Sequence, residues 1–495
     1  MFKRLLTVAT VFALTLSTGR ICAAAEQNFW PFWVRETDAA GNVQSWQAIG
    51  PLFFGARSAD RTGYQGFRPL YLQQLDPRGT AIEHTLLYPV YTQRQDTEVF
   101  SWTVLNLINY SGPTNPAPGP DAAPKGFDLW PVYFSRDTGD PATSYHAVFP
   151  VAGTIKSRFG YDRLQWMLFP LYWQSQQGPV TTTSTPWPII KSTAGGGVHG
   201  FTFWPLFSRE EKPDVYRRQY YLWPLIYKYE SQLDSAQPHV TEGFLPFYAQ
   251  ESRAGLVSRD IVWPFFGYSV QQTPVRYREY RYFWPLFVRG RGDEINVDRW
   301  APFYTHSIRK GTEKTWVMWP LVRQEQWTAD GLVQTKRQLF YFLYWSMEQR
   351  SAINPNLPAA EKTHLWPIMS TWNNGAGRIQ VQMPSPLEVF FTDNNEVRQL
   401  YSPLFALFRV DQRAPDDVRL SLLWNAITWH RTPAAREFHF GPLFSTYRNA
   451  ATESECIALG NGLIGLRRTA GAKGWHLFLF DFSPQTDSVV PSPTR

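Results

Sequence analysis

The stretch 275-VRYREYRYFWPLFVRGR-291 decides the fold that we expect for this chain. Charged residues lie towards both of its ends, whereas residues 282–288 form an apolar centre around Pro285. Aromatic and β-branched residues dominate the stretch, as they do in β-strands. Both alternating phases are apolar at the centre, and a strand that is apolar on both faces has to be covered on both faces. We therefore predict a long strand with the proline motif at its centre.

The proline motif recurs along the chain, most often as a Trp before the proline and an aliphatic or aromatic pair after it. Between Pro205 and Pro320, successive motif prolines are 19, 22, 18, 21, 17 and 18 residues apart. A fixed period of this size is typical of a repeat architecture rather than of independent domains. The residues that we assign to the structural repeat are Trp204, Pro205, Trp223, Pro224, Trp263, Pro264, Trp284, Pro285, Trp319, Pro320, Trp366 and Pro367.

Turn signals lie about midway between successive motifs, for example Thr273-Pro274, Gly292-Asp293 and Asp330-Gly331. Short turns between strands favour hairpins, so neighbouring strands should run antiparallel. No helical period is sustained anywhere in the chain. We predict an all-β, antiparallel up-and-down meander of about 24 strands, which forms either a closed barrel or a propeller-like or stacked-sheet repeat.

The N-terminus has the pattern of a secretory signal peptide. Lys3 and Arg4 precede a mostly apolar run, and three alanines at 23–25 precede Glu26, so we predict cleavage after Ala25. A lipoprotein reading at Cys22 is disfavoured by the preceding arginine. We expect a signal peptide at 1–25, a single repetitive β domain at 26–483 and a disordered tail at 484–495. After cleavage Cys456 is the only cysteine, so no intramolecular disulfide can form.

The export signal, an even strand number and the hairpin spacing make the mature chain resemble bacterial outer-membrane β-barrel proteins as an architectural class, without a specific family. The resemblance implies apolar strand centres facing lipid, aromatic residues near the interfaces and charged strand ends in water. It also implies an outer-membrane location, outer-membrane lipids as partners, and a role in passing or handling amphiphilic molecules.

The motif prolines argue against a closed barrel. Each proline lacks an N–H, so a proline at the centre of a strand in hydrocarbon leaves a carbonyl without its partner. The competing interpretation makes each proline a bend between two short strands, which gives a soluble or peripheral periplasmic repeat with the aromatic residues as core. Such a scaffold would bind a protein or a glycan.

The sequence contains no recognisable catalytic, cofactor or metal motif. His430 and His439 lie on adjacent predicted strands and could approach each other, but singly placed histidines in strands are usually ordinary hydrogen-bonding residues. We therefore expect no catalytic residues, cofactor or metal, with an enzyme acting on an envelope polysaccharide as a minor alternative. Arginines and lysines are spread along the chain, which argues against a nucleic-acid partner.

Overall fold

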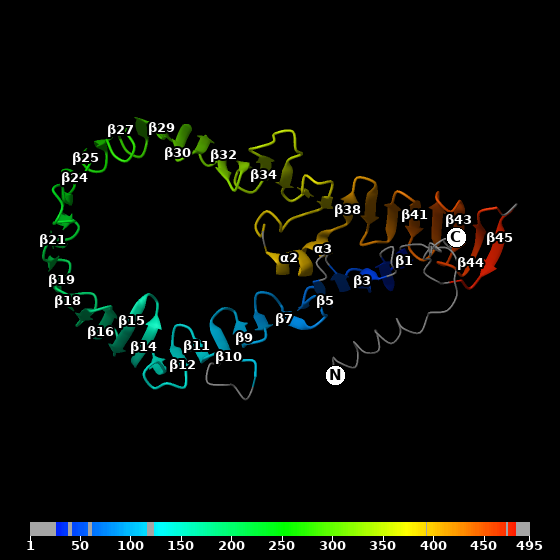
Figure 1. The fold of residues 1–495 in the computed structure, drawn as a ribbon, viewed down its shortest axis with the longest axis horizontal. Coiled ribbons are helices and arrows are strands. Elements are labelled where there is room, and N and C mark those ends of the chain that lie inside the picture. The colour runs from blue at the N-terminus through cyan, green and yellow to red at the C-terminus, as the bar shows by residue number, and fades with distance from the viewer. Residues whose placement is uncertain are drawn as a thin grey trace, which may run out of the picture. The chain divides into compact units, whose positions relative to one another are not determined.

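The structure is a computed structural model that describes residues 26–37, 42–57, 62–115, 123–392, 394–471 and 474–481. The described residues form 45 β-strands and two short α-helices, which confirms the all-β prediction (Figure 1). They divide into two compact units, with residues up to 89 and from 342 onward in unit 1 and residues 90–341 in unit 2. The expected signal peptide at 1–25 and the tail at 484–495 lie outside the described residues. None of the described helices is both long and apolar enough to cross a membrane.

Unit 2 is a ribbon in which each strand pairs antiparallel with the next one along the chain (Figure 1). Most of its strands have five or six residues. They are β8 (Tyr91–Gln95), β9 (Val99–Val104), β10 (Ile108–Pro113), β11 (Lys125–Leu129), β12 (Tyr133–Asp137), β13 (Tyr145–Val148), β14 (Ala152–Arg158), β15 (Tyr161–Met167), β16 (Tyr172–Gln177), β17 (Val180–Ser184), β18 (Ile190–Gly195), β19 (Val198–Phe203), β20 (Phe207–Lys212), β21 (Tyr216–Tyr221), β22 (Ile226–Ser231), β23 (His239–Phe244), β24 (Tyr248–Arg253), β25 (Leu256–Ile261), β26 (Phe266–Gln271), β27 (Tyr277–Tyr282), β28 (Phe287–Gly292), β29 (Ile295–Trp300), β30 (Tyr304–Arg309), β31 (Thr312–Val317), β32 (Val322–Ala329) and β33 (Leu332–Leu339).

Unit 1 combines an N-terminal and a C-terminal run of antiparallel strands. The N-terminal run consists of β1 (Glu26–Phe29), β2 (Trp33–Thr37), β3 (Val43–Ala48), β4 (Phe53–Arg57), β5 (Gly63–Phe67), β6 (Tyr71–Leu75) and β7 (Ala81–Leu86). The C-terminal run consists of β34 (Tyr344–Ser351), β35 (Ala360–Leu365), β36 (Met369–Asn373), β37 (Ile379–Met383), β38 (Phe408–Ala414), β39 (Asp417–Leu422), β40 (Ile427–Arg431), β41 (Ala435–Phe440), β42 (Phe444–Asn449), β43 (Ser454–Leu459), β44 (Ile464–Arg468) and β45 (His476–Leu479). Between β37 and β38 lie the helices α2 (Asn395–Leu400) and α3 (Ser402–Phe405).

The motif proline lies in a turn between two strands, so the prediction of about 24 long strands with central prolines is wrong. Trp204 and Pro205 follow β19, and Phe203 O accepts the Leu206 N–H at 2.8 Å before β20 begins. The predicted strand at 275–291 is likewise two strands, β27 and β28. A proline in a turn needs no N–H donor, which removes the unpaired-carbonyl problem. The alternative interpretation, in which each proline is a bend, is correct on this point.

Barrel closure is also not found. In the described part of the chain β1 pairs with β2, β45 pairs with β44, and the first and last strands do not pair with each other. β1 instead contacts β41, which lies in the C-terminal run of unit 1. The even strand number on which the barrel resemblance partly rested is replaced by 45 strands.

The two runs of unit 1 are joined around α2. Leu400 at the end of α2 is fully buried and packs with Phe54 of β4 and Leu72 of β6. Asn394 caps the helix by accepting the Val397 N–H, and its amide also donates to the Tyr88 hydroxyl at 2.7 Å. These contacts position α2 against the N-terminal strands.

Candidate functional site

The proline motifs of unit 2 all lie on one edge of the ribbon. Successive strands run in opposite directions, so alternate turns lie on the same edge. Between β19 and β33, the motif turns alternate with polar turns such as Asp293-Glu294 and Asp330-Gly331. We call the motif side the proline edge; it consists of residues 204–206, 222–225, 245–247, 262–265, 283–286, 301–303 and 318–321.

The aromatic side chains of the proline edge are exposed. Trp284 is 41%, Trp319 59% and Phe247 61% exposed, and Trp204, Trp223 and Trp263 are similarly accessible. The competing interpretation, in which the aromatic residues form a core, is therefore wrong for these rings of the proline edge. The ribbon there is a single layer of short strands, so a turn at its edge has no second layer to pack against.

Backbone groups along the proline edge are paired from one turn to the next. Pro205 O accepts the Trp223 N–H at 2.7 Å, and Leu206 O accepts the Leu222 N–H at 2.8 Å. Equivalent bonds link the later turns, including Trp284 N–H to Phe265 O at 3.0 Å. The edge is thus apolar in its side chains and internally hydrogen bonded in much of its main chain.

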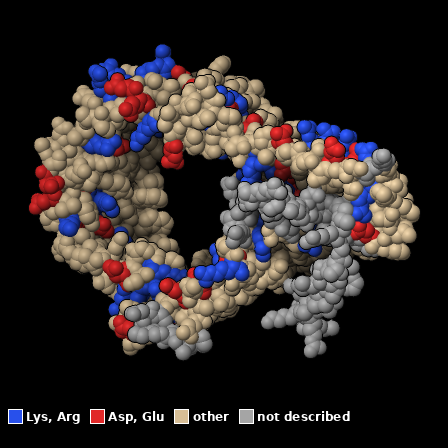
Figure 2. Space-filling view, turned by 45° about the vertical axis from the view of Figure 1, so that its right-hand side comes forward, with Lys and Arg blue, Asp and Glu red and all other residues tan. Residues whose placement is uncertain are grey.

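Polarity changes stepwise with distance from the proline edge. The strand residues next to the turns are all apolar or aromatic, from the pair Phe203 and Phe207 to the pair Val317 and Val322. The next two rows of β19–β33 carry more basic than acidic residues. The basic ones are Arg209, Lys228, Arg259, Arg281, Arg289, Arg299, Arg323 and Arg337, and the acidic ones are Glu242, Asp260 and Asp298. On the face shown in Figure 2, Lys and Arg form small groups interspersed with Asp and Glu.

The motif of unit 1 is placed differently. Trp366 is partly buried, packs edge-to-face on Phe342 with ring centroids 5.3 Å apart, and donates its indole N–H to Pro386 O at 3.1 Å. Pro367 O accepts the Ser385 N–H at 2.9 Å. The motif at Trp366 of unit 1 is therefore packed, whereas the motif at Trp284 of unit 2 is exposed.

The interior of unit 1 is strongly polar. Glu26 and Asn28 are two residues apart on β1, so both face the same side, where they meet Arg419 of β39 and Thr428 of β40. The Arg419 guanidinium donates to Glu26 Oε2 at 3.0 Å, and both side chains are buried. Burial by itself raises the pKa of Glu26, but Arg419, His439 and Thr428 lower it to about 2. β1 is thus held by a buried ion pair.

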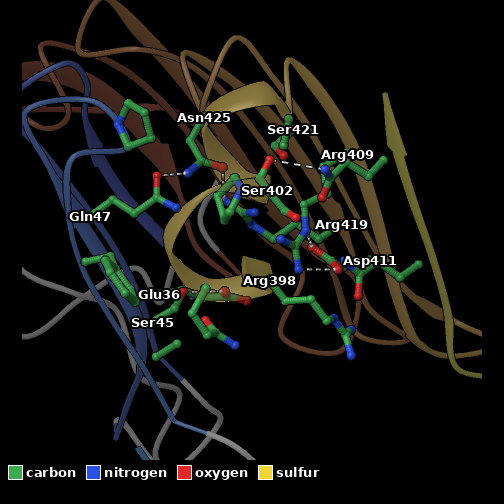
Figure 3. A pocket seen from close by; sticks show the side chains of 18 of the residues that line it. Glu36, Ser45, Gln47, Arg398, Ser402, Arg409, Asp411, Arg419, Ser421 and Asn425 are labelled. Atoms are coloured by element: carbon green, nitrogen blue, oxygen red, sulfur yellow. Dashed lines mark hydrogen bonds and ion pairs between the residues drawn. The ribbon is translucent and has the colours of Figure 1, made fainter. Parts of the chain in front are cut away.

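A cavity of about 870 Å³ lies beside this ion pair, entirely within unit 1 (Figure 3). Its walls come from β2–β4, β36–β39 and the two helices. Figure 3 shows Gln47 and Ser45 on the N-terminal strands, Arg409 and Asp411 on the C-terminal strands, and Ser402 of α3 between them.

Seven arginines and three carboxylates line the cavity. The arginines are Arg57, Arg68, Arg378, Arg398, Arg409, Arg413 and Arg419, and the acids are Glu36, Glu388 and Asp411. Asp411 binds Arg409 through both carboxylate oxygens at 2.7 and 3.0 Å, and Glu36 pairs with Arg413. Burial alone would raise the pKa of Asp411, yet the surrounding arginines lower it. The field inside the cavity is therefore positive.

Arg68 is the unusual member of this set. It is only 4% exposed, and its guanidinium donates to Gln399 O at 2.6 Å and Pro51 O at 2.7 Å while stacking on the Phe54 ring. No carboxylate of the described residues pairs with it. Burial, together with the nearby Arg409 cation, lowers the pKa of Arg68 to about 9. Burying a charge without a counter-ion costs free energy, and this distinguishes Arg68 from the paired arginines of the lining.

The rest of the lining consists of hydrogen-bonding and aromatic side chains. Ser402 is 3% exposed, and its Oγ has no hydrogen-bond partner among the described residues. Amide groups are numerous, and Gln47 accepts from Asn425 at 2.8 Å. The amide and indole side chains in the lining are Gln44, Gln47, Asn374, Gln380, Gln382, Gln399, Gln412, Asn425, Trp46, Trp372 and Trp424.

The two candidate histidines do not form a metal site. His430 Nε2 lies 2.8 Å from Asp417 Oδ1, whereas His439 pairs with Glu437, so each histidine has its own carboxylate. Burial opposes protonation of His439, but Glu437 and Glu26 raise its pKa. Among the described residues, no group of three or more His, Cys, Asp and Glu is placed to hold a metal ion.

No sequence motif indicates that these residues line one cavity. Arg68 and Arg409 are far apart in the chain, and they share the cavity because the N-terminal and C-terminal runs of unit 1 lie together. One local pattern pointed to a polar interior. In β1, the alternate residues Glu26 and Asn28 are polar, and they are the buried ones. In comparisons with known proteins, no family model matches the chain and no curated protein is significantly similar to it.

Proposed function

We propose that the protein is an exported cell-envelope protein that attaches to a lipid surface through the proline edge of unit 2. The turn residues and the first strand row would enter the headgroup and upper acyl region of one leaflet, and the basic rows would lie among anionic headgroups. Apolar faces of interfacial proteins reach about 5–10 Å into this region, which corresponds to a turn and one or two strand residues. The observation that carries the proposal is the uninterrupted row of exposed, apolar proline turns.

Backbone pairing favours lipid as the occupant of the edge. Unpaired main-chain groups are costly in hydrocarbon, and here neighbouring turns bond to each other, as Pro205 O and Trp223 N–H do. The side chains before the proline also vary, with Trp284, Leu245 and Ala301 at equivalent places. A leaflet requires apolarity and tolerates this variation, whereas a protein partner would require a fixed shape.

The basic residues near the edge fit the same surface. Arg259, Arg289 and Arg299 lie one or two rows behind the turns, at the level where lipid phosphates would be. Each basic residue near an anionic membrane contributes about 1 kcal/mol to binding. The opposite edge of the ribbon carries polar turns, so we place it in water, with the ribbon standing on one leaflet.

Vesicle flotation of the mature chain tests the proposal. The double variant Trp263→Ser/Trp284→Ser removes two edge rings, and the matched control Phe159→Ser/Tyr161→Ser removes two exposed rings at the opposite edge of the ribbon, at the turn between β14 and β15. We expect binding to vesicles with anionic lipid to fall at least tenfold in the edge variant and less than twofold in the control. Equal effects in both variants, or no binding of the wild type to vesicles, would reject the proposal in favour of a protein-binding scaffold.

A further inference from the structure

We propose that the arginine-lined cavity of unit 1 binds an anionic sugar, with its phosphate or carboxylate group held by Arg68. This site is separate from the proline edge, and the inference does not depend on membrane attachment.

The arginines that line the cavity favour an anionic ligand. Arg409, Arg413 and Arg419 are neutralised by carboxylates, but Arg68 and the exposed Arg57 and Arg378 form no ion pair with described residues. Arginine presents a planar set of donors that matches the oxygens of phosphate and carboxylate groups. Two of the Arg68 donors are committed to Gln399 O and Pro51 O, which fixes the guanidinium, while Nη2 makes no bond to the described residues.

Ser402 supplies a second unsatisfied group in the lining of the same cavity. Its buried Oγ lines the cavity without a hydrogen-bond partner among the described residues, and it lies three residues after Gln399, whose carbonyl holds Arg68. Buried hydroxyl groups normally have partners. The anionic group of a ligand in this cavity would supply the missing counter-charge to Arg68, and a ligand oxygen would accept a hydrogen bond from the Ser402 hydroxyl.

The remaining lining selects a sugar over a bare anion. A volume of about 870 Å³ is far larger than a phosphate ion needs and lies in the range of small-molecule sites. Amide side chains of the lining such as Gln44 and Gln380 offer both donors and acceptors, which suits hydroxyl groups, and the indoles of Trp46, Trp372 and Trp424 supply apolar faces. The ligand class is therefore a sugar that carries a phosphate or a carboxylate.

Calorimetric titration of the full mature chain tests this assignment with four probes: glucose 1-phosphate, galacturonate, glucose and inorganic phosphate. We expect at least one of the two anionic sugars to bind at least tenfold more tightly than glucose and than inorganic phosphate. If inorganic phosphate or glucose binds as tightly as both anionic sugars, or if neither anionic sugar binds, the proposal is wrong.

Substitutions locate the site. Arg68→Met keeps a side chain of similar length on Phe54, and we expect it to fold and to weaken binding of the anionic sugar at least tenfold; Ser402→Ala should weaken it severalfold. Arg289→Met, on the unit 2 ribbon, is the matched control and should leave binding unchanged. Binding that survives Arg68→Met at full strength in a folded protein overturns the assignment.

A competition experiment distinguishes a lipid headgroup from a free sugar as the ligand. Vesicles that contain a glycolipid with a phosphorylated sugar headgroup either compete with soluble glucose 1-phosphate, which identifies a headgroup site, or do not compete, which identifies a free ligand. The edge variant Trp263→Ser/Trp284→Ser should retain binding of the soluble sugar. This result separates the cavity from the proposed lipid attachment.

Discussion

The repeat motif lies in opposite environments at Trp284 of unit 2 and at Trp366 of unit 1. In unit 2 the apolar turn residue Trp284 is exposed, and in unit 1 the equivalent Trp366 is packed and hydrogen bonded. Unit 1 in turn buries charged groups, with Glu26 and Arg419 in its interior. The difference teaches that the motif specifies a turn, while a second layer of chain decides whether its rings become core or surface.

The largest expected difference between the units concerns their ion pairs. We expect Glu26→Gln to lower the free energy of unfolding of unit 1 by about 3–5 kcal/mol, because Arg419 would remain buried without its counter-ion. The matched variant Glu211→Gln, in a solvent-exposed pair with Arg209 of unit 2, should leave the free energy of unfolding nearly unchanged. Urea denaturation measures both values, and similar small losses would show that the buried pair does not hold β1.

The pH dependence of stability is a second test of the buried ion pair between Glu26 and Arg419. The folded pKa of Glu26 is about 2 against an ordinary value of 4.5, so its contribution is complete above about pH 4.5 and is lost as the pH falls towards 2. This lowered pKa corresponds to a stabilisation on the order of 3 kcal/mol. Unfolding curves from pH 7 to pH 2 should therefore show the stability gap between wild type and Glu26→Gln narrowing below pH 4.5. A gap that stays constant over this range would contradict the buried ionised carboxylate.

The smallest effects are expected for the motif rings. Trp366→Ala should destabilise unit 1 by about 2–4 kcal/mol, since it removes contacts with Phe342 and a hydrogen bond to Pro386. Trp284→Ala should change the stability of unit 2 in water by less than about 1 kcal/mol, because much of the ring is already solvated. Thermal unfolding of the two single variants measures the difference. Comparable losses at both positions would mean that the edge ring is part of a core.

Repeat period, antiparallel pairing and polar turns such as Asp330-Gly331 were predictable from the sequence, because each is a local property. The number of strands was not predicted, since apolar residues continue on both sides of Pro285 and conceal the turn between β27 and β28. The competing interpretation missed the exposure of Trp284 because apolar residues are usually buried. In a single-layer ribbon no second layer of chain covers the turns, so their apolar side chains stay exposed.

The cavity could not have been predicted from local patterns. Arg68, Ser402 and Arg409 carry no spacing that indicates a shared site, and their proximity depends on the packing of the two runs of unit 1. The polar side of β1 was the one visible sign, since Glu26 and Asn28 would ordinarily face solvent. Knowing which face of a strand is covered requires the tertiary structure.

Bonding between neighbouring turns makes the proline edge extensible. Each added pair of strands contributes one more turn with the same chemistry, attached to its predecessor as Trp223 is attached to Pro205. Many weak anchors on one chain act at high effective concentration, so attachment strength would grow with repeat number and no individual turn would be indispensable. Gain or loss of whole hairpins could then tune residence on a surface while leaving the sugar-binding unit untouched.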